Sequence, residues 1–314
     1  MTKISVAFRK VNYSGPLVGG VDETKLKESL RLWKSTENKV YIIGGVKGEK
    51  EISRVEEIES KTSEIKSNDG IADKVRTHLI SIPLPKFPSE VALLTPTAGN
   101  VQGKDHFSAD LAFLEAAWSQ GLKVISIGQD GAATEQKSAQ MLSDEFSKSR
   151  HFLTFEDKHT NVLLKTPIIT RTTTSGEIIK MPFMTIQDSK HAAKTGRNQI
   201  FSGARLLCSG NDSIQYGQLL KFSQSRYSTI YKRDVVNTDK QDDKAAARLY
   251  AAKTLSRLIK MDGNEFLVIY LFLIGELISA WQTRHLPHII RIKIAMRTYF
   301  FLRGSFQFIS SLRM

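Results

Sequence analysis

Three aspartates stand where predicted strands end, and carboxylates in that position can bind metal ions. Asp22 follows the stretch GPLVGGV, Asp130 follows KVISIGQ, and Asp188 follows an apolar stretch that begins at Ile178. Active sites of open α/β sheets often lie at the ends of strands. Mg²⁺ prefers oxygen ligands and usually takes one or two carboxylates together with substrate phosphate. The pattern therefore predicts a divalent-cation site, with Mg²⁺ or Mn²⁺ as the expected ion.

A basic helix is predicted directly after Asp188. Its spacing gives two adjoining polar rows, formed by Lys190, His191, Lys194, Arg197 and Asn198. In one interpretation Asp188 caps this helix and the cations are solvated. In the other, Asp188 is a metal ligand and the helix holds the phosphates of a nucleic acid.

Two further carboxylates have both a structural and a functional interpretation. Asp130, in the sequence GQDG, is as well suited to a helix cap or a turn as to metal binding. Glu276 interrupts an apolar helical run, where a glutamate is satisfied at a helix–helix contact or points into a site. The sequence leaves these alternatives open.

The charge of the chain indicates a polyanionic partner. The net charge is +13, and residues 201–314 hold 17 Lys and Arg against 8 Asp and Glu. Such an excess favours nucleic acid or an anionic membrane surface. The apolar run at 266–281 is shorter than the roughly 20 residues needed to span a bilayer, so we expect a buried helix and no membrane segment.

Several classes of protein are disfavoured by the sequence. The single cysteine, Cys208, excludes an intramolecular disulfide and a Cys-rich zinc module. The N-terminus has no signal peptide, so we expect the nucleus or the cytoplasm. The glycines match neither a P-loop nor a dinucleotide fingerprint, and no small-molecule substrate is implied.

The order of predicted elements defines the fold class. Strands are expected at 15–22, 39–46, 76–84 and 90–98, and helical spacing is expected after Asp22 at Leu26, Leu30 and Trp33. The charged pattern of residues 49–73 predicts a solvated helical segment. The next predicted elements are a helix at 107–122, a strand at 123–131, a helix at 132–146, a strand at 178–188 and the basic helix. Beyond about residue 212 the pattern is helical. This order predicts a mixed sheet flanked by helices, followed by an all-helical region.

The segment from Asp188 resembles transposases of the P-element and THAP-domain type, together with transposon-derived fungal proteins. It matches their D-x-x-H-x-x-K-x-x-R-N pattern at Asp188, His191, Lys194, Arg197 and Asn198. The stretch GVDETKL, with Asp22, is similar to the family's strand that carries the first catalytic aspartate. The stretch VISIGQDGAATEQ is similar to the element that precedes the second aspartate.

The resemblance implies an RNase H-like transposase core over residues 1–212 and a helical, insertion-like region over residues 213–314. It implies DNA as partner, cleavage and strand transfer with two metal ions, and a homo-oligomer as a possibility. Asp22 and Asp188 are then the metal ligands. The family's third acid, a glutamate, lies beyond the helical insertion; Glu276 is the candidate here, and we expect a truncated chain with an unfinished triad. The alternative is a non-catalytic remnant that binds nucleic acid or protein.

Overall fold

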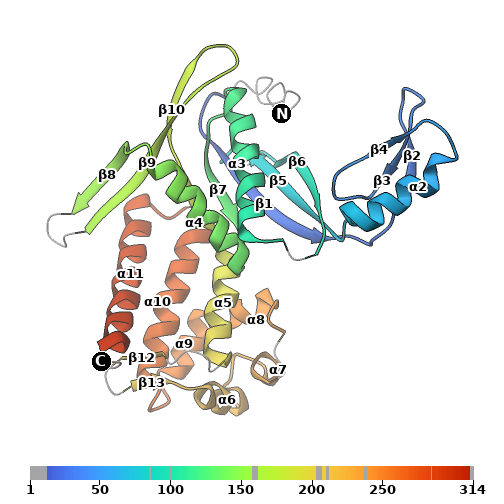
Figure 1. Ribbon diagram of the computed structural model, residues 1–314. Helices are drawn as coiled ribbons and strands as arrows, with labels where there is room; N and C mark the ends of the chain where they lie inside the picture. Colours follow the sequence, from blue (N-terminus) through green and yellow to red (C-terminus); the bar gives the residue numbers. More distant parts are fainter. Residues whose placement is uncertain are drawn as a thin grey trace. The chain divides into compact units, whose positions relative to one another are not determined.

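The computed structural model describes residues 13–84, 86–99, 101–157, 162–202, 207–209, 212–236, 239–283 and 285–311 (Figure 1). Contacts divide the chain into two compact units, Met1–Gln187 and Asp188–Met314. The division falls before the position 212/213 expected from the sequence. Each unit is described by itself below.

The first unit is built on a mixed five-stranded sheet with the order β11-β7-β1-β5-β6. Its strands are β1 (Leu17–Lys25), β5 (Lys74–Ser81), β6 (Glu90–Thr97), β7 (Val124–Gln129) and β11 (Met184–Gln187). The central strand β1 pairs parallel with β7 and antiparallel with β5. β7 also pairs parallel with β11, and β5 pairs antiparallel with β6. The predicted mixed sheet is therefore confirmed.

Strand β1 is longer than the sequence pattern predicts. Its side chains alternate between buried and less buried from Leu17 to Asp22, as expected for a strand with one covered face. Pairing with β5 then continues to Lys25, and Glu23 forms an ion pair with Lys74 at 3.4 Å. Asp22 therefore lies within β1, and the expectation that it ends a strand is wrong.

The helical spacing expected after Asp22 is also wrong. Leu26 and Trp33 are 43% and 46% exposed. An amphipathic helix is stabilised mainly by burying its apolar face, which these residues do not do. Arg31–Lys34 instead form a strand, β2, that pairs with the next strand along the chain.

Helices α3 (Gly103–Ser119) and α4 (Ala133–Ser147) supply the helical layer of this core and confirm the helices predicted at 107–122 and 132–146. Phe113, Leu114 and Trp118 of α3 are fully buried with Ile127 of β7. The Trp118 indole donates to the carbonyl of Val124 at 3.0 Å. These contacts fix the distance between the helices and the sheet.

A buried polar network lies inside this apolar core. Its members are Arg76 and His78 of β5, Asp110 of α3, Gln129 of β7, and Glu135 and Ser138 of α4. The Arg76 guanidinium donates to both carboxylate oxygens of Asp110, at 2.8 and 3.0 Å. Gln129 and Ser138 donate to Asp110 at 2.6 and 2.8 Å. Arg76 is 1% exposed and Asp110 is 0% exposed, so all these bonds are shielded from water.

The network keeps its central carboxylate ionised. Burial favours the neutral acid, but the hydrogen bond from His78 and the charge of Arg76 outweigh it, so the pKa of Asp110 lies below its ordinary value. Burial also disfavours the charged guanidinium of Arg76. Glu135 and Asp110 overcome this effect, and the pKa of Arg76 is raised.

A small subdomain interrupts the first unit between β1 and β5. It consists of β2, β3 (Val40–Ile43), β4 (Lys50–Ile52), α2 (Glu57–Glu64) and the π-helical turn η1 (Ile65–Asp69). Ile42, Ile52 and Ile65 form its own core. Gly44 has a φ of 106°, and a Cβ there would collide with the carbonyl of Ser29. The strand predicted at 39–46 is confirmed over Val40–Ile43. The helical segment predicted at 49–73 is confirmed over residues 57–69, but Lys50–Ile52 form strand β4 instead.

A second antiparallel sheet has the order β10-β9-β8. Its strands are β8 (Phe152–Asp157), β9 (Val162–Thr172) and β10 (Ile178–Pro182). The single strand predicted at 178–188 is therefore two strands, because β10 pairs with β9 whereas β11 pairs with β7. Phe183, which is 1% exposed, separates them and donates its amide to the carbonyl of Pro167.

The second unit is mainly helical, as expected. Its elements are α5 (Ser189–Ser202), β12 (Leu207–Ser209), β13 (Asp212–Ile214), α6 (Tyr216–Gln224), α7 (Lys232–Val235), α8 (Asp243–Leu249), α9 (Ala252–Leu258), α10 (Glu265–Gln282) and α11 (His288–Ser311). Leu219, Phe222, Leu258, Leu267 and Leu271 form the centre of its core. β12 and β13 make a short hairpin that the sequence pattern did not predict.

Helix α10 contains the apolar run noted in the sequence. Within the described residues it is the one helix long and apolar enough to cross a membrane by length and composition. Seven of its residues are buried in the second unit, among them Leu267, Leu271 and Leu273. Packing within this unit therefore accounts for part of the apolar character of α10, whereas Ile269, Phe272 and Trp281 are exposed.

Asp110→Asn tests the buried network. Removing the charge leaves Arg76 buried with an incomplete set of partners, and we expect the free energy of unfolding to fall by about 3–5 kcal/mol in urea denaturation. The matched control is Glu115→Gln on the same helix, which breaks a half-exposed ion pair with Arg171 and should cost at most about 1 kcal/mol. Equal effects of the two substitutions would contradict a special role for Asp110. Because its pKa is lowered by folding, the stabilisation is present above about pH 3.9 and is lost as the pH falls through the folded value.

Candidate functional site

Each aspartate found in the sequence lies two residues beyond one row of paired residues in the parallel strands. Gly20 of β1 pairs with Gly128 of β7, and Gly128 pairs with Ile186 of β11. In the first unit, Asp22 of β1 and Asp130, which directly follows β7, each lie two residues beyond this row. Asp188 likewise lies two residues beyond Ile186, directly after the last residue of β11, and begins the second unit.

The glycines in this row leave the sheet open beside the carboxylates. Side chains on a strand alternate between faces, so Asp22 shares its face with Gly20. A Cβ at Gly20 would come no nearer than 3.9 Å to Leu79, and one at Gly128 no nearer than 3.7 Å to the carbonyl of Gly19. A ligand can approach the backbone closely at such positions.

Asp22 is exposed and keeps most of its capacity to accept bonds. One carboxylate oxygen, Oδ1, accepts from the amide of Glu23 at 2.9 Å. Across the part of the chain that the structure describes, no Lys, Arg or His side chain forms an ion pair with Asp22. Asp22 can therefore bind a cation without first losing a partner.

Asp130 borders a cleft of about 310 Å³ in the first unit. The cleft is lined by Gln129, Asp130, Glu135, Gln136, Ala139, Gln140, Ser143, Thr185, Ile186 and Gln187. Asp130 accepts the amide of Ala132 through Oδ1 at 2.8 Å, which is the turn interpretation left open by the sequence. Gly131 follows in this turn, and a Cβ there would displace the terminal amide of Gln187. The second oxygen of Asp130 has no protein partner among the described residues.

A preformed metal cluster is not present in the described ranges. No group of three or more His, Cys, Asp or Glu side chains there is arranged to hold a metal ion. Asp22 and Asp130 instead provide two carboxylates from adjacent strands. That donor set suits Mg²⁺, which commonly takes one or two carboxylates and completes its shell with water and substrate phosphate.

Asp188 caps helix α5. Its Oδ2 atom accepts from the amide of His191 at 3.1 Å and contacts Nδ1 of the same residue at 2.8 Å. Partial burial favours the neutral acid, but the hydrogen bonds from His191 outweigh it and lower the pKa of Asp188. The capping interpretation is thus observed, whereas metal binding by Asp188 stays a prediction.

The basic residues of α5 have protein partners. Lys194 is 8% exposed and forms an ion pair with Asp243 at 3.1 Å. Arg197 is 1% exposed and donates to the carbonyls of Asp239 and Asp242, at 2.5 and 3.1 Å.

Asn198 completes this contact by donating to the carbonyl of Lys240 at 3.3 Å. The row therefore anchors residues 239–243. Nucleic-acid binding by these residues stays a prediction, and Lys190 is the cation of the row whose side chain is exposed.

Glu276 forms a helix–helix contact within the second unit. Its Oε2 atom accepts from Arg297 of α11 at 2.6 Å, and the two side chains are 33% and 49% exposed. This contact is one of the two alternatives that the sequence left open for Glu276, the other being a catalytic role. The catalytic role of Glu276 stays a prediction.

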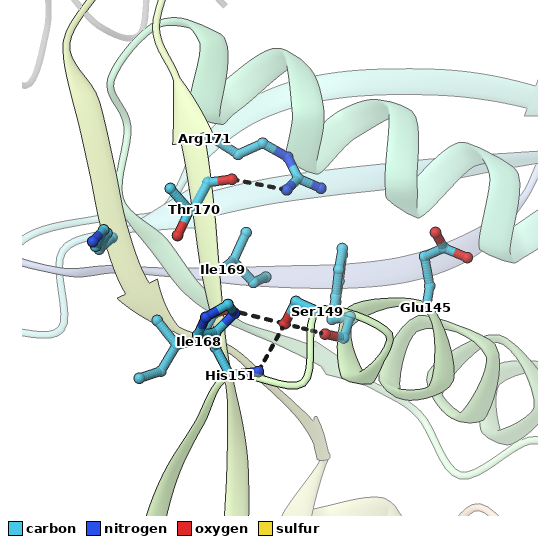
Figure 2. Close-up of a pocket in the computed structure, with 9 residues that line it drawn as sticks. Glu145, Ser149, His151, Ile168, Ile169, Thr170 and Arg171 are labelled. Atoms are coloured by element: carbon cyan, nitrogen blue, oxygen red, sulfur yellow. Dashed lines mark hydrogen bonds between the residues drawn. The ribbon is translucent and has the colours of Figure 1, made fainter.

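A larger cavity, of about 630 Å³, lies between the end of α4 and strands β9 and β10 (Figure 2). Ser149 and His151 line it, but only the backbone amide of His151 contacts Ser149 Oγ, at 3.4 Å. Ser149 itself donates to the carbonyl of Phe146, and Arg171 donates to the carbonyl of Thr170. A nucleophile needs a side-chain base within reach, so this cavity contains no catalytic pair.

The buried polar network was missed from the sequence. Arg76 and His78 lie two residues apart on a strand, which places both side chains on the same face, and that face is the covered one. The spacing R-x-H in the segment RTHLISIPL was the available signal. Polar residues that alternate along a strand are usually expected to face solvent. The partners of Arg76 and His78 also lie far away in the sequence, at separations of 32 to 59 residues.

The strand order, with β1 central, two parallel neighbours on one side and two antiparallel strands on the other, is that of an RNase H-like α/β fold. The helices α3 and α4 and the helical second unit complete the architecture expected from the sequence.

A solved structure with a similar fold is described as the Drosophila P element transposase strand transfer complex. The two chains superpose with a TM-score of 0.56 and 15% sequence identity, over 90% of this chain and 57% of that chain. The present chain therefore spans little more than half the length of its structural relative. No family model and no curated protein matches the sequence.

Substitutions at Asp188 separate the cap from a charge-dependent role. Asp188→Ala removes the acceptor for the amide of His191 and should lower the free energy of unfolding by about 1 kcal/mol. Asp188→Asn keeps an acceptor and should cost only a few tenths of a kcal/mol. Thermal unfolding of both variants measures this difference, and an Asn variant as unstable as the Ala variant would contradict capping as the main structural role. The pKa of Asp188 is lowered by folding, so its contribution is present above about pH 3.9 and declines as the pH falls below it.

Proposed function

We propose that this protein is related to DNA transposases and that Asp22 and Asp130 hold the divalent cation of a phosphodiester-cleaving site. The observation that carries the proposal is the position of the two aspartates, each two residues beyond the paired glycines Gly20 and Gly128 of adjacent parallel strands. Both carboxylates retain an oxygen free of protein partners within the described residues, and the neighbouring glycines leave room for a substrate. The further resemblance to P-element, THAP-type and fungal transposon-derived proteins belongs to this proposal.

The chemistry assigns each group a part. Mg²⁺ or Mn²⁺, when bound, would stabilise the charge that develops on the attacking and leaving oxygens during displacement at phosphorus. Asp22 and Asp130 would fix the ion by one oxygen each. Water or a 3′-hydroxyl would form the new bond to phosphorus as the bond to the leaving oxygen breaks, and the proton of the attacking group would pass to solvent.

DNA is the proposed partner because the chain is strongly basic. The excess of 17 Lys and Arg over 8 Asp and Glu in residues 201–314 suits a phosphate backbone. The exposed Lys190 is a candidate phosphate contact, whereas Lys194 and Arg197 would first have to leave their partners in residues 239–243. A homo-oligomer, and a place in the nucleus, would follow from transposase function.

The alternative is a non-catalytic protein that binds nucleic acid or another protein. A specific observation favours it: within the described ranges no third acid joins the two aspartates, and Glu276 is paired with Arg297. Asp188 would then act only as the cap of α5.

The first test is nicking of supercoiled DNA by the purified chain with Mg²⁺ or Mn²⁺. Asp22→Asn and Asp130→Asn should each lower the rate by about 100-fold or more, because each removes charge that helps stabilise the transition state. Asp188→Asn, which keeps the cap, decides whether that carboxylate also takes part. Glu276→Gln decides whether that carboxylate is the third acid. A fall of about 100-fold would support the role, whereas a change within about threefold, less than about 1 kcal/mol, would contradict it.

Metal binding is measured separately by calorimetric titration with Mn²⁺ in the absence of DNA. The wild-type chain should bind Mn²⁺ more tightly than the double variant Asp22→Asn/Asp130→Asn. DNA binding without nicking, together with equal Mn²⁺ affinity of the two proteins, would reject the metal site and favour the non-catalytic alternative.

DNA binding itself should weaken steeply with salt. Each phosphate neutralised by Lys or Arg contributes about −0.9 to the slope of log K against log salt concentration for duplex DNA. Anisotropy titrations of a labelled duplex at several salt concentrations give this slope, and Lys190→Gln should make it shallower by about one unit. A slope near zero would contradict phosphate contacts as the source of affinity.

A further inference from the structure

The small sheet β2–β3–β4 has two different faces. Ile42 and Ile52 lie on one face and are buried with Ile65 of η1. Alternation along the strands places Trp33 and Tyr41 on the opposite face. Trp33 is 46% exposed, so the second face presents an aromatic surface to solvent.

Trp33 and Tyr41 form a pair on adjacent strands. They are direct cross-strand partners, and their ring centroids lie 5.7 Å apart with an angle of 33° between the ring planes. Each ring therefore limits the movement of the other. A fixed, exposed aromatic surface of this kind is the feature on which single-stranded nucleic acids stack their bases.

Cations surround the aromatic pair. Arg31 lies two residues before Trp33 on the same strand and therefore shares its face, whereas Lys34 lies on the opposite face. Arg31 is exposed, and its side chain forms no ion pair or hydrogen bond within the described residues. Lys39 lies on the aromatic face and pairs with Glu51 at 3.6 Å, where both side chains are about half exposed. An ion pair so exposed contributes little and is readily exchanged for a phosphate.

Charge is separated within this subdomain. Residues 27–54, which include the three strands, hold 7 Lys and Arg against 4 Asp and Glu, or +3. Residues 55–70, which include α2 and η1, hold 2 against 5, or −3. The strand segment is thus the basic one, and it also carries the aromatic pair. This distribution suits an anionic partner on the sheet and disfavours one on the helices.

A cavity of about 300 Å³ adjoins the edge strand β2 on its other side. It is lined by Leu30, Arg31, Leu32, Ile42, Ile58, Thr62, Lys66 and Ile71. Its lining is mostly apolar and includes two cations, Arg31 and Lys66. Such a cavity can accept an unstacked base while the phosphate of that nucleotide remains outside the cavity. Bases in a duplex are available neither for stacking on the aromatic pair nor for entering this cavity. The preferred ligand is therefore single-stranded nucleic acid.

We infer that the aromatic face of β2 and β3, centred on Trp33 and Tyr41, binds single-stranded nucleic acid by stacking bases between flanking cations. This site is independent of the proposed Asp22–Asp130 site. It concerns binding without cleavage, and it needs no divalent ion.

The test measures binding of a fluorescently labelled oligothymidylate of about 16 nucleotides to the full chain in EDTA, which prevents metal-dependent cleavage. Trp33→Ala should weaken binding by about 5- to 150-fold, the effect of losing one stacked base. The matched control is Trp281→Ala in α10, because Trp281 is 40% exposed and lies outside the subdomain. It should bind like the wild-type chain.

Further arms keep the inference open to refutation. Trp33→Phe should restore part of the affinity, and Arg31→Gln should lower the salt slope by roughly one unit without abolishing stacking. Binding of oligouridylate is measured beside that of oligothymidylate. A loss of affinity for one or both in the Trp33→Ala variant supports the site and identifies the preferred sugar. Equal affinity of the Trp33→Ala and Trp281→Ala variants, or an equal effect of Trp33→Ala on duplex DNA, would overturn it. Loss of nicking through Asp22→Asn has no bearing on these outcomes.

Discussion

The buried contact between Arg76 and Asp110 is the constraint on which the first unit depends. It joins a strand to a helix, and through Gln129 and Glu135 it extends to β7 and α4. A charge in an apolar core is tolerated only when its partners hold a defined geometry, so a shift of any of these elements would leave a buried group unpaired. The network therefore fixes where β7 ends and thus where Asp130 begins its turn.

Much of the fold could be predicted from the sequence, because apolar periodicity reports which face of an element is covered. The segments 107–122 and 132–146 are helices for this reason, and 123–131 is a strand. The same reasoning failed at Leu26, Leu30 and Trp33, where the spacing suited a helix. Leu30 packs against the core of the small subdomain, but Leu26 and Trp33 are exposed. Periodicity gives a preference, and the final structure depends on whether the rest of the chain offers a surface to bury.

The buried network shows why the candidate site could be predicted only in part. Asp22 and Asp130 were found because each follows an apolar stretch of sequence, which is a local pattern. Arg76 and Asp110 are 34 residues apart, and their pairing depends on how the helix lies over the sheet. A single sequence contains no local signal for such a pair. The sequence thus indicates where carboxylates can gather, but not which buried charges position them.

The helix after Asp188 illustrates how one pattern can satisfy two different functions. An aspartate followed three residues later by a histidine suits a helix cap, and the capping bond to the amide of His191 is present. The cations at i, i+4 and i+7 of this helix suit phosphate binding as well as they suit the acidic loop at residues 239–243. Burial distinguishes the two, since Arg197 is 1% exposed and is already satisfied by backbone carbonyls.

A metal ligand needs both a suitable position and an oxygen that is free to bind. Asp22 and Asp130 fit the two conditions, because each lies two residues beyond the paired Gly20 and Gly128 and each uses a single oxygen on a local amide. Asp188 meets the first through its place after β11, but its Oδ2 atom already serves His191 through two contacts. Coordination through its other oxygen would keep the cap intact. The protein can therefore assign capping and catalysis to different atoms of one carboxylate, so the observed cap does not argue against the predicted ligand.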